Sequence, residues 1–383
     1  MQKHRRTIQY ECSEETAAGR KKHLLSVGKE NLLMKGIATL AHSGIQIVRL
    51  FLILSYTISA LFLFSHSTSV YAQAPETEKI VFVSKRDGNA EIYIMNPDGS
   101  EQVNLTQHPA EDYNPAWSPN GKQIVFSSDR TDDVFDLYLM NPDGKNVQKV
   151  FKDNEYRRYP AWSPDGKHIA YAQADKRKAI RAFGARFAPT ADHTLYIATP
   201  NGTSIEKLTK GFEPSWSPDG SQLIFVVAGL KHAPLGLFDL QTHTQKVLRP
   251  EKLRWTLSPR WSPQGDKIAF GKLSMARFNE RGGISFRNST LYIANPDGTA
   301  LQQVGDGVAL DPAWSPQGNQ LIYNDRDIAD VFQLYKTAFN GGNPTQLTRK
   351  GNNFGADWSN PNVLEISPSA HSLTTTWGKI KTD

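Results

Sequence analysis

A Trp-Ser pair recurs six times along this chain of 383 residues, at Trp117, Trp162, Trp216, Trp261, Trp314 and Trp358. Successive tryptophans are 45, 54, 45, 53 and 44 residues apart. Self-similarity with a period of about 20–50 residues is typical of repeat proteins, in which one small unit recurs and buries its apolar faces against its neighbours. This repeat therefore constrains the fold more than the overall composition does.

Each repeat contains four short apolar segments separated by turn residues. After Trp117 the chain passes through Ile124–Phe126 and Leu137–Met140, then through the turn Asn141–Gly144 to a short strand within 147–151. Proline fixes φ at the second position of such turns, and glycine accepts the positive φ that the last position often needs. Runs that are apolar on both faces are typical of strands in a sheet covered on both sides.

Radial repetition of four-stranded sheets forms a β-propeller. We therefore predict an all-β protein with six four-stranded antiparallel blades, in which each tryptophan packs against the neighbouring blade. The first repeat starts at Ile80 without a Trp-containing strand, whereas Phe354–Ser359 follows the last complete blade. This C-terminal Trp-Ser strand is expected to complete blade 1 and close the ring.

The segment before the repeats has a different character. Leu50–Phe64 is 15 residues long without a charge, follows Arg49 and precedes Ala72-Gln73-Ala74. This order predicts a secretory signal peptide, because a spanning helix needs about 20 apolar residues. The basic region is long for a signal, so Met34 is a candidate for the true start. An uncleaved N-terminal anchor is the alternative.

We predict three regions: an N-terminal extension with a signal peptide (1–74), the propeller (75–362) and a C-terminal tail (363–383). The formal net charge is +6, but nine of the 44 basic and four of the 38 acidic residues lie in 1–74, which leaves 35 and 34. The nearly neutral remainder argues against nucleic-acid binding. Cys12 is the one cysteine, so a disulfide framework and a cysteine-based zinc site are excluded.

Two segments of the repeats resemble a known family. Pro160–Lys167 followed by Ile169–Tyr171, and also Ser84–Gly99, resemble the TolB-type propeller repeat, known as the WD40-like or PD40 repeat. The resemblance covers about residues 79–360 and implies a six-bladed periplasmic propeller that binds protein, as TolB binds the peptidoglycan-associated lipoprotein. TolB also has an N-terminal α/β domain, which we expect to be absent here.

Two long repeats carry basic insertions that also contain phenylalanines, between residues 173 and 193 and between residues 271 and 289. Their predicted ligand-binding residues are Lys176, Arg177, Arg181, Arg186, Arg277, Arg281 and Arg287. In a propeller, the loops between strands 2 and 3 and those linking blades lie on one face. These insertions suit an acidic peptide, a polyanionic sugar or an anionic lipid head group. The alternative is that they are solvated loops that happen to be basic.

Loops that link blades on the same face add further candidates for ligand binding: Arg157, Arg158, Tyr159, Arg254 and Trp255. Glu213 and Asp311 precede Trp216 and Trp314, and are expected to point towards the channel. They could hold a divalent cation together with water, or bond neighbouring blades. Three Asp-Arg or Arg-Asp pairs recur at one loop position and are interpreted as structural ion pairs; they are Arg86-Asp87, Asp129-Arg130 and Asp325-Arg326.

The sequence contains no catalytic triad, no nucleophile elbow and no metal-ligand spacing. We therefore predict an exported, non-catalytic scaffold, periplasmic or secreted, monomeric and without a cofactor. Its partner is expected to be a protein, a peptide or a cell-envelope polysaccharide, with no stable membrane insertion once the signal is cleaved. The alternative is a propeller hydrolase or lyase with a cation-dependent site in the channel, built on Glu213 and Asp311.

Overall fold

A computed structural model describes residues 73–175, 193–228, 232–248, 253, 255–273, 289–305, 307–326 and 331–359, the backbone of 277–278 and 284–285, and three isolated positions. The chain divides into two compact units, 1–71 and 72–383. In the first unit the described positions, Lys35, Leu40 and Gly44, are helical. The predicted signal peptide and the C-terminal tail lie outside the described residues. No helix in the described part is long and apolar enough to cross a membrane.

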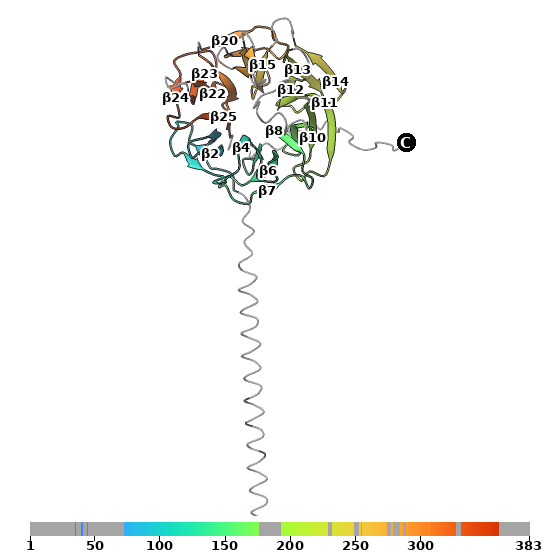
Figure 1. The fold of residues 1–383 in the computed structure, drawn as a ribbon, viewed down its shortest axis with the longest axis vertical. Helices are drawn as coiled ribbons and strands as arrows, with labels where there is room; N and C mark the ends of the chain where they lie inside the picture. The colour runs from blue at the N-terminus through green and yellow to red at the C-terminus, as the bar shows by residue number, and fades with distance from the viewer. Residues whose placement is uncertain are drawn as a thin grey trace, which may run out of the picture. The chain divides into compact units, whose positions relative to one another are not determined.

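The second unit consists of antiparallel sheets arranged in a ring (Figure 1). The strands are given from the axis outward. One sheet contains β25 (Asn353–Trp358), β1 (Ile80–Ser84), β2 (Glu91–Met95) and β3 (Val103–Asn104). The next contains β4 (Asp112–Trp117), β5 (Ile124–Ser128), β6 (Asp136–Met140) and β7 (Gln148–Lys149).

Two further four-stranded sheets lie later in the chain. The first contains β15 (Thr256–Trp261), β16 (Ile268–Leu273), β19 (Ser289–Ala294) and β20 (Gln302–Val304). The second contains β21 (Leu310–Trp314), β22 (Gln320–Arg326), β23 (Phe332–Ala338) and β24 (Thr345–Gln346). The insertion between β16 and β19 contains a two-stranded ribbon, β17 (Arg277–Phe278) and β18 (Ile284–Ser285).

The remaining sheet has seven strands instead of four. It contains β8 (Tyr156–Trp162), β9 (Ile169–Ala174), β10 (Thr194–Ala198), β11 (Ile205–Trp216), β12 (Gln222–Val227), β13 (Leu235–Asp239) and β14 (Thr244–Val247). The first half of β11 pairs with β10 and its second half, from Gly211, pairs with β12. Elsewhere a loop separates the rim strand from the next inner strand, but here the chain runs from rim to axis as one strand. The antiparallel propeller is thus confirmed, whereas six separate four-stranded blades are not.

The Trp-containing strands β4, β8, β11, β15, β21 and β25 line the axis, each contacting the next, and β25 contacts β4. β25 also pairs with β1, with Trp358 opposite Ile80. Closure of the ring by the C-terminal Trp-Ser strand is therefore confirmed. This closure joins the two ends of the propeller without a covalent turn.

The serine of each Trp-Ser pair holds the turn that follows the inner strand. Ser163 Oγ accepts the backbone N–H of His168 at 2.9 Å and donates to Asp165 at 2.6 Å. Equivalent bonds form at Ser118, Ser217, Ser262 and Ser315. At the seam, Ser359 Oγ accepts the N–H of Lys79 at 2.7 Å, and its own N–H donates to the Lys79 carbonyl at 2.8 Å. The seam thus reproduces the hydrogen bonds of a turn between segments that are 280 residues apart.

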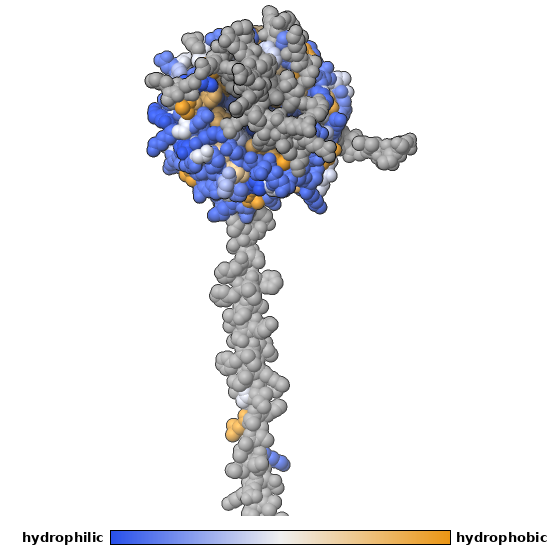
Figure 2. Space-filling view, in the orientation of Figure 1, coloured by the Kyte–Doolittle hydropathy of each residue, from blue (hydrophilic) through white to orange (hydrophobic). Residues whose placement is uncertain are grey.

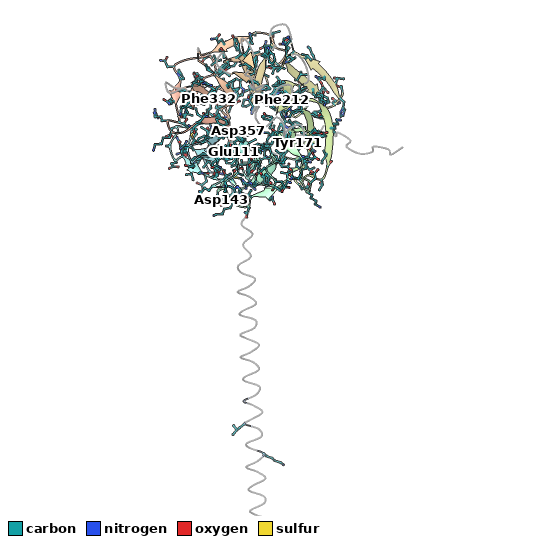
Figure 3. All side chains as sticks on the ribbon, viewed as in Figure 1. Glu111, Asp143, Tyr171, Phe212, Phe332 and Asp357 are labelled. Atoms are coloured by element: carbon teal, nitrogen blue, oxygen red, sulfur yellow. The ribbon has the colours of Figure 1, made fainter. Side chains whose placement is uncertain are left out.

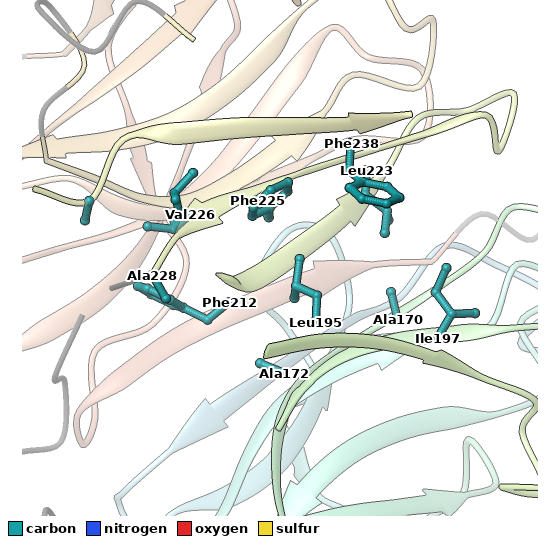
Figure 4. Packing of buried hydrophobic residues seen from close by; sticks show 12 residues of the cluster. Ala170, Ala172, Leu195, Ile197, Phe212, Leu223, Phe225, Val226, Ala228 and Phe238 are labelled. Atoms are coloured by element: carbon teal, nitrogen blue, oxygen red, sulfur yellow. The ribbon is translucent and has the colours of Figure 1, made fainter. Parts of the chain in front are cut away.

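Apolar side chains between neighbouring sheets form the core. In one such cluster Leu195 and Phe225 pack together, and Trp216 lies against them (Figure 4). Trp216 Nε1 also donates to the carbonyl of Ala161 on the preceding inner strand, at 3.0 Å. Here the expected packing of a tryptophan against the neighbouring blade is confirmed. The coloured part of the propeller face in Figure 2 is mostly hydrophilic, with apolar residues scattered over it.

Gly144 is required both for its positive φ and because its turn lies directly against the preceding blade. Gly144 has a φ of 78°, which favours glycine. A Cβ there would lie 2.3 Å from the carbonyl oxygen of Leu105, in the loop after β3. The turn between β6 and β7 therefore touches the backbone of the preceding blade directly.

Candidate functional site

A bulge recurs in every inner strand, three residues before the tryptophan. The bulged residues all have positive φ, between 50° and 60°, and are Asn114, Tyr159, Glu213, Ser258, Asp311 and Gly355. The strand pairing shifts register next to each of them. A bulge re-aims a side chain, and a non-glycine residue at positive φ costs about 1–3 kcal/mol. The ring thus repeats one strained backbone feature but places a different side chain on it in each blade.

Three of these residues form a hydrogen-bonded chain across β11, β15 and β21. Glu213 is 5% exposed, and its Oε2 accepts the backbone N–H of Ser258 at 2.6 Å. The Ser258 hydroxyl donates to Asp311 Oδ1, while the amide nitrogen of Asn324 lies 3.0 Å from Asp311 Oδ2. Ser258 therefore links the two predicted channel carboxylates.

Burial shifts the acid–base chemistry of these carboxyl groups. Burial, together with the nearby charge of Asp311, raises the pKa of Glu213 to about 7, although the Ser258 N–H and Arg260 oppose the shift. Burial also raises the pKa of Asp311 and of Asp357. A carboxyl group with a pKa near 7 exchanges its proton at neutral pH, as a general acid or base must.

Sequence reasoning missed two charged residues near this chain. Asp357 Oδ2 accepts the backbone N–H of Trp117 at 2.7 Å, which links β25 to β4 close to the axis (Figure 3). Arg260 favours the ionised form of Glu213, Asp311 and Asp357. Both residues directly precede a repeat tryptophan, where the other repeats have alanine or serine. A charge at an otherwise small position of the repeat was the available signal.

A divalent cation held by Glu213 and Asp311 together with water stays a prediction. In the described part of the chain no group of three or more histidine, cysteine, aspartate or glutamate residues is placed to hold a metal ion. A hard cation such as calcium takes about 6–8 oxygen ligands. The two carboxylates accept hydrogen bonds from Ser258, as the alternative interpretation expected.

Arg157 is engaged within the protein. It is 2% exposed, with Nη1 3.1 Å from Asp136 Oδ2 and Nη2 2.8 Å from Asp153 Oδ1. Its guanidinium carbon lies 4.0 Å from the centroid of the Phe151 ring. Its bonding groups face acids on a neighbouring blade and on the loop before β8. The structure therefore gives Arg157 partners within the protein, while its predicted role in ligand binding stays a prediction.

Arg158 has a different environment. It is 9% exposed, and its guanidinium carbon lies 4.7 Å from the ring centroid of Phe135, 5.0 Å from that of Tyr159 and 5.1 Å from that of Tyr113. Nη2 donates to Asn114 Oδ1 at 3.2 Å, and Nε has no hydrogen-bond partner. No carboxylate in the described ranges lies within ion-pair distance of it.

Aromatic rings continue from Arg158 along the same end of the ring. Tyr113 lies between Phe354 and Phe135, at centroid distances of 6.0 and 5.6 Å. Phe135 is followed by Tyr156 at 6.3 Å, and Tyr156 by His193 at 6.2 Å. Tyr113, Tyr156 and Phe354 are partly exposed. This aromatic arc spans the sheets of β1, β4 and β8 at the end where the inner strands begin.

The other predicted site residues are Trp255, Arg277 and seven further basic residues. Trp255 is half-buried, meets His232 edge-on at 5.6 Å and packs beside Leu257 and Leu273. The structure describes only the backbone of Arg277, in β17. The remaining basic residues lie outside the described residues and stay predictions; they are Lys176, Arg177, Arg181, Arg186, Arg254, Arg281 and Arg287.

Two of the three recurring loop arginines, Arg130 and Arg86, form hydrogen bonds with side chains other than the aspartates beside them. Arg130 Nη2 donates to both carboxylate oxygens of Asp112, each at 3.0 Å. Arg86 Nη2 donates to Asn353 Oδ1 at 3.1 Å and Nε to Ser84 Oγ at 2.8 Å. Each arginine thus ties the end of the second strand to the innermost strand of the same sheet. The predicted pairing of Arg130 with Asp129 is wrong, because the inner strand supplies the partner.

Comparison with known proteins gives both distant and partial matches. A protein named "Protein TolB homolog" from Chlorobium luteolum is 26% identical over 182 residues, which cover 43% of this chain and 34% of that protein. The Tol-Pal system protein TolB of Geobacter sulfurreducens is 44% identical over 52 residues, 14% of this chain and 12% of that protein. The chain therefore spans no more than about a third of the length of these relatives.

Structural similarity covers more of the propeller. The crystal structure of TolB from Acinetobacter baumannii superposes with a TM-score of 0.61 at 17% identity, covering 76% of this chain and 69% of that one. An identity this low supports the fold alone. The family model of the TolB beta propeller domain, PD40, matches residues 48–184 and 188–364, which is most of the chain. The chain belongs to the TolB β-propeller family.

Proposed function

We propose that this protein is an exported, non-catalytic binding propeller that recognises a protein or peptide, or a cell-envelope polysaccharide, at the end of the ring where the inner strands begin. The repeated bulge carries this proposal. One backbone feature recurs in all six inner strands, yet its side chains are an amide, a phenol, two carboxyls and a hydroxyl, with a glycine in the last strand. A constant scaffold with varied side chains on one surface is what a recognition site requires.

Two further observations support this function. The partly exposed tyrosines of the aromatic arc lie at the same end of the ring, and tyrosine supplies contact area together with a polar tip. One relative carries the name Tol-Pal system protein, which favours a protein partner in the cell envelope and a periplasmic location. We also infer that the ring has six blades, with the seven-stranded sheet acting as two blades that share β11.

A capture experiment tests the binding function. The immobilised protein would be presented with envelope proteins and with cell-wall fragments, and compared with a variant whose insertions 176–192 and 274–288 are replaced by short Gly-Ser turns. We expect a component that the natural chain retains, that the variant retains less well, and that added salt releases. The matched control is Asp219→Lys, in an exposed turn at the opposite end of the inner strands. Equal capture by all three proteins, or capture of nothing, would contradict the proposal.

Glu213 keeps an enzymatic alternative open. Its pKa of about 7 suits proton transfer at neutral pH, and the carboxyl of Asp311 is nearby. The alternative would be a hydrolase or lyase whose turnover depends on both carboxyl groups. Glu213→Gln and Asp311→Asn should abolish any turnover found with envelope sugars or peptides. Binding that survives in both variants without turnover in the natural chain would favour the scaffold.

A further inference from the structure

Arg158 differs from two other arginines of the described ranges that are also well enclosed. Arg157 is paired with two aspartates, and Arg130 is paired with Asp112. Arg158 is equally enclosed, but meets three aromatic rings, the side chain of Tyr156 and one neutral amide, with no carboxylate among them. A buried charge without an opposite charge is strongly disfavoured, because water no longer solvates it.

The carboxyl group of Glu213, on the neighbouring inner strand, does not neutralise the charge of Arg158. Glu213 feels the charge of Arg158, but more weakly than it feels Asp311 and Arg260. Burial also holds the pKa of Glu213 at about 7, so this carboxyl is neutral for much of the time at neutral pH. The positive charge of Arg158 is thus left for a group that the described chain does not supply.

The surroundings of Arg158 restrict what that group can be. The rings of Tyr113, Phe135 and Tyr159 lie about the guanidinium, whose own plane matches a flat carboxylate through two parallel N–H bonds. A phosphate is tetrahedral and carries more negative charge than a carboxylate, so the ionised forms of Glu213 and Asp311 would repel it more. The half-buried side chains of Tyr113 and Tyr159 beside the guanidinium suit the apolar part of a peptide side chain.

We propose that Arg158 is the receptor for a carboxylate of a bound peptide segment, an aspartate, a glutamate or a C-terminus, which it holds among the rings of Tyr113, Phe135 and Tyr159. This inference rests on the proposed binding function and names the chemical group recognised there. Asn114, which accepts a hydrogen bond from Nη2, is a positioning residue that orients the guanidinium. An arginine surrounded by aromatic rings, with no acid of the described residues in ion-pair distance, is a site prepared for an external anion.

Isothermal titration of the full chain with an acetylated tri-glutamate peptide tests this assignment. Tri-glutamine, which has the same shape without charge, and inorganic phosphate at matched ionic strength are the comparison probes. We expect tri-glutamate to bind at least tenfold more tightly than tri-glutamine or phosphate. Arg158→Met should reduce tri-glutamate binding to the tri-glutamine level, and Arg158→Lys, which keeps the charge but loses the planar fork, should give an intermediate value.

Arg86→Met is the matched control, because Arg86 also lies over an aromatic ring, 4.4 Å from the Tyr93 centroid, but has satisfied neutral partners. It should bind tri-glutamate as the natural chain does. The melting temperature gives a second readout: a merely structural Arg158 would lower it on substitution, whereas we expect Arg158→Met to leave it unchanged or raise it.

Three results would overturn the inference: tri-glutamate binding by Arg158→Met equal to that of the natural chain, preference for phosphate, or no tri-glutamate binding by the natural chain up to about 10 mM, beyond which a specific contact is negligible. The envelope capture experiment separates the two proposals. If the natural chain and Arg158→Met capture the same component equally, the binding function stands and the carboxylate assignment fails. If the natural chain captures nothing, the binding function itself fails.

Discussion

Arg157 and Arg158 are neighbours in one strand, yet their surroundings differ in almost every respect. Arg157 faces the space between blades, where Asp136 and Asp153 neutralise it. Arg158 lies towards the axis, where the groups close to it are aromatic rings and an amide. The buried charge of Arg157 is thus paired with acids of the protein, whereas that of Arg158 is not paired with an acid of the described residues.

The largest change in stability should come from replacing Arg157, the arginine that aspartates neutralise. Arg157→Met leaves Asp136, which is fully buried, with only Lys149 at 3.2 Å, so we expect the free energy of unfolding to fall by about 3–5 kcal/mol. Urea unfolding at pH 7 measures this loss. The double variant Arg157→Met with Asp136→Leu should recover much of it, because no charge is then left buried alone. A loss below about 1 kcal/mol in the single variant would contradict the inferred difference between Arg157 and Arg158.

A smaller effect should come from Glu213 on the axial side. The pKa of this carboxyl is about 7 in the folded protein against 4.5 when unperturbed, so the folded state binds the proton more tightly. Stability should therefore fall by about 2–3 kcal/mol as pH rises from about 4.5 to 7, and remain low above that range.

Glu213→Gln should remove this decline, because an amide does not titrate and still accepts the Ser258 N–H. Urea unfolding across pH 4–8 provides the measurement, with Asp219→Asn in an exposed turn as the control. If the decline persists unchanged in Glu213→Gln, another group is responsible, and the axis is less strained electrostatically than the structure indicates.

Arg158→Met should change stability by less than about 1 kcal/mol, and in the stabilising direction if it changes at all. Removing a buried charge that has no opposite partner relieves its desolvation, and methionine fills much of the same space between the rings. Measured beside Arg157→Met in the same urea series, it tests the comparison directly. A loss as large as that of Arg157→Met would mean that both arginines serve the fold.

The smallest effect should come from Asp311→Asn. It removes the negative charge that raises the pKa of Glu213 but keeps an oxygen that can accept the Ser258 hydroxyl. The pH at which stability declines should therefore move down, by less than one pH unit, since burial is the larger cause. An unmoved midpoint would show that the two carboxyl groups are not coupled.

The repeat made the architecture predictable. The Trp-Ser pairs gave the ends of the inner strands and the closure at Trp358, because tryptophan packing and the serine-held turn both depend on local residues. The continuous β11 was not predictable, since nothing marks where the rim strand ends before Gly211. Turn residues locate chain reversals but not an unbroken crossing from rim to axis.

The site was predictable only in part. Glu213 and Asp311 were identified from their positions before the tryptophans, and both lie on the axis-facing bulges. The roles of Arg157 and Arg158 could not be separated, because the acids that neutralise Arg157 come from other segments of the chain. Arg260 and Asp357 would have been found by comparing the six repeats position by position and asking where a charge replaces a small residue.

The seam at Ser359 and Lys79 has a consequence for the order of the blades along the chain. Because it repeats the bonds of the turn from Ser163 to His168, the seam is one equivalent turn that happens to lack a peptide connection. Joining Ser359 to Lys79 through a four-residue Pro-Asp-Gly-Lys linker and opening the chain at another such turn would give a circular permutant. Such a permutant should fold to the same ring, since no blade is structurally the first.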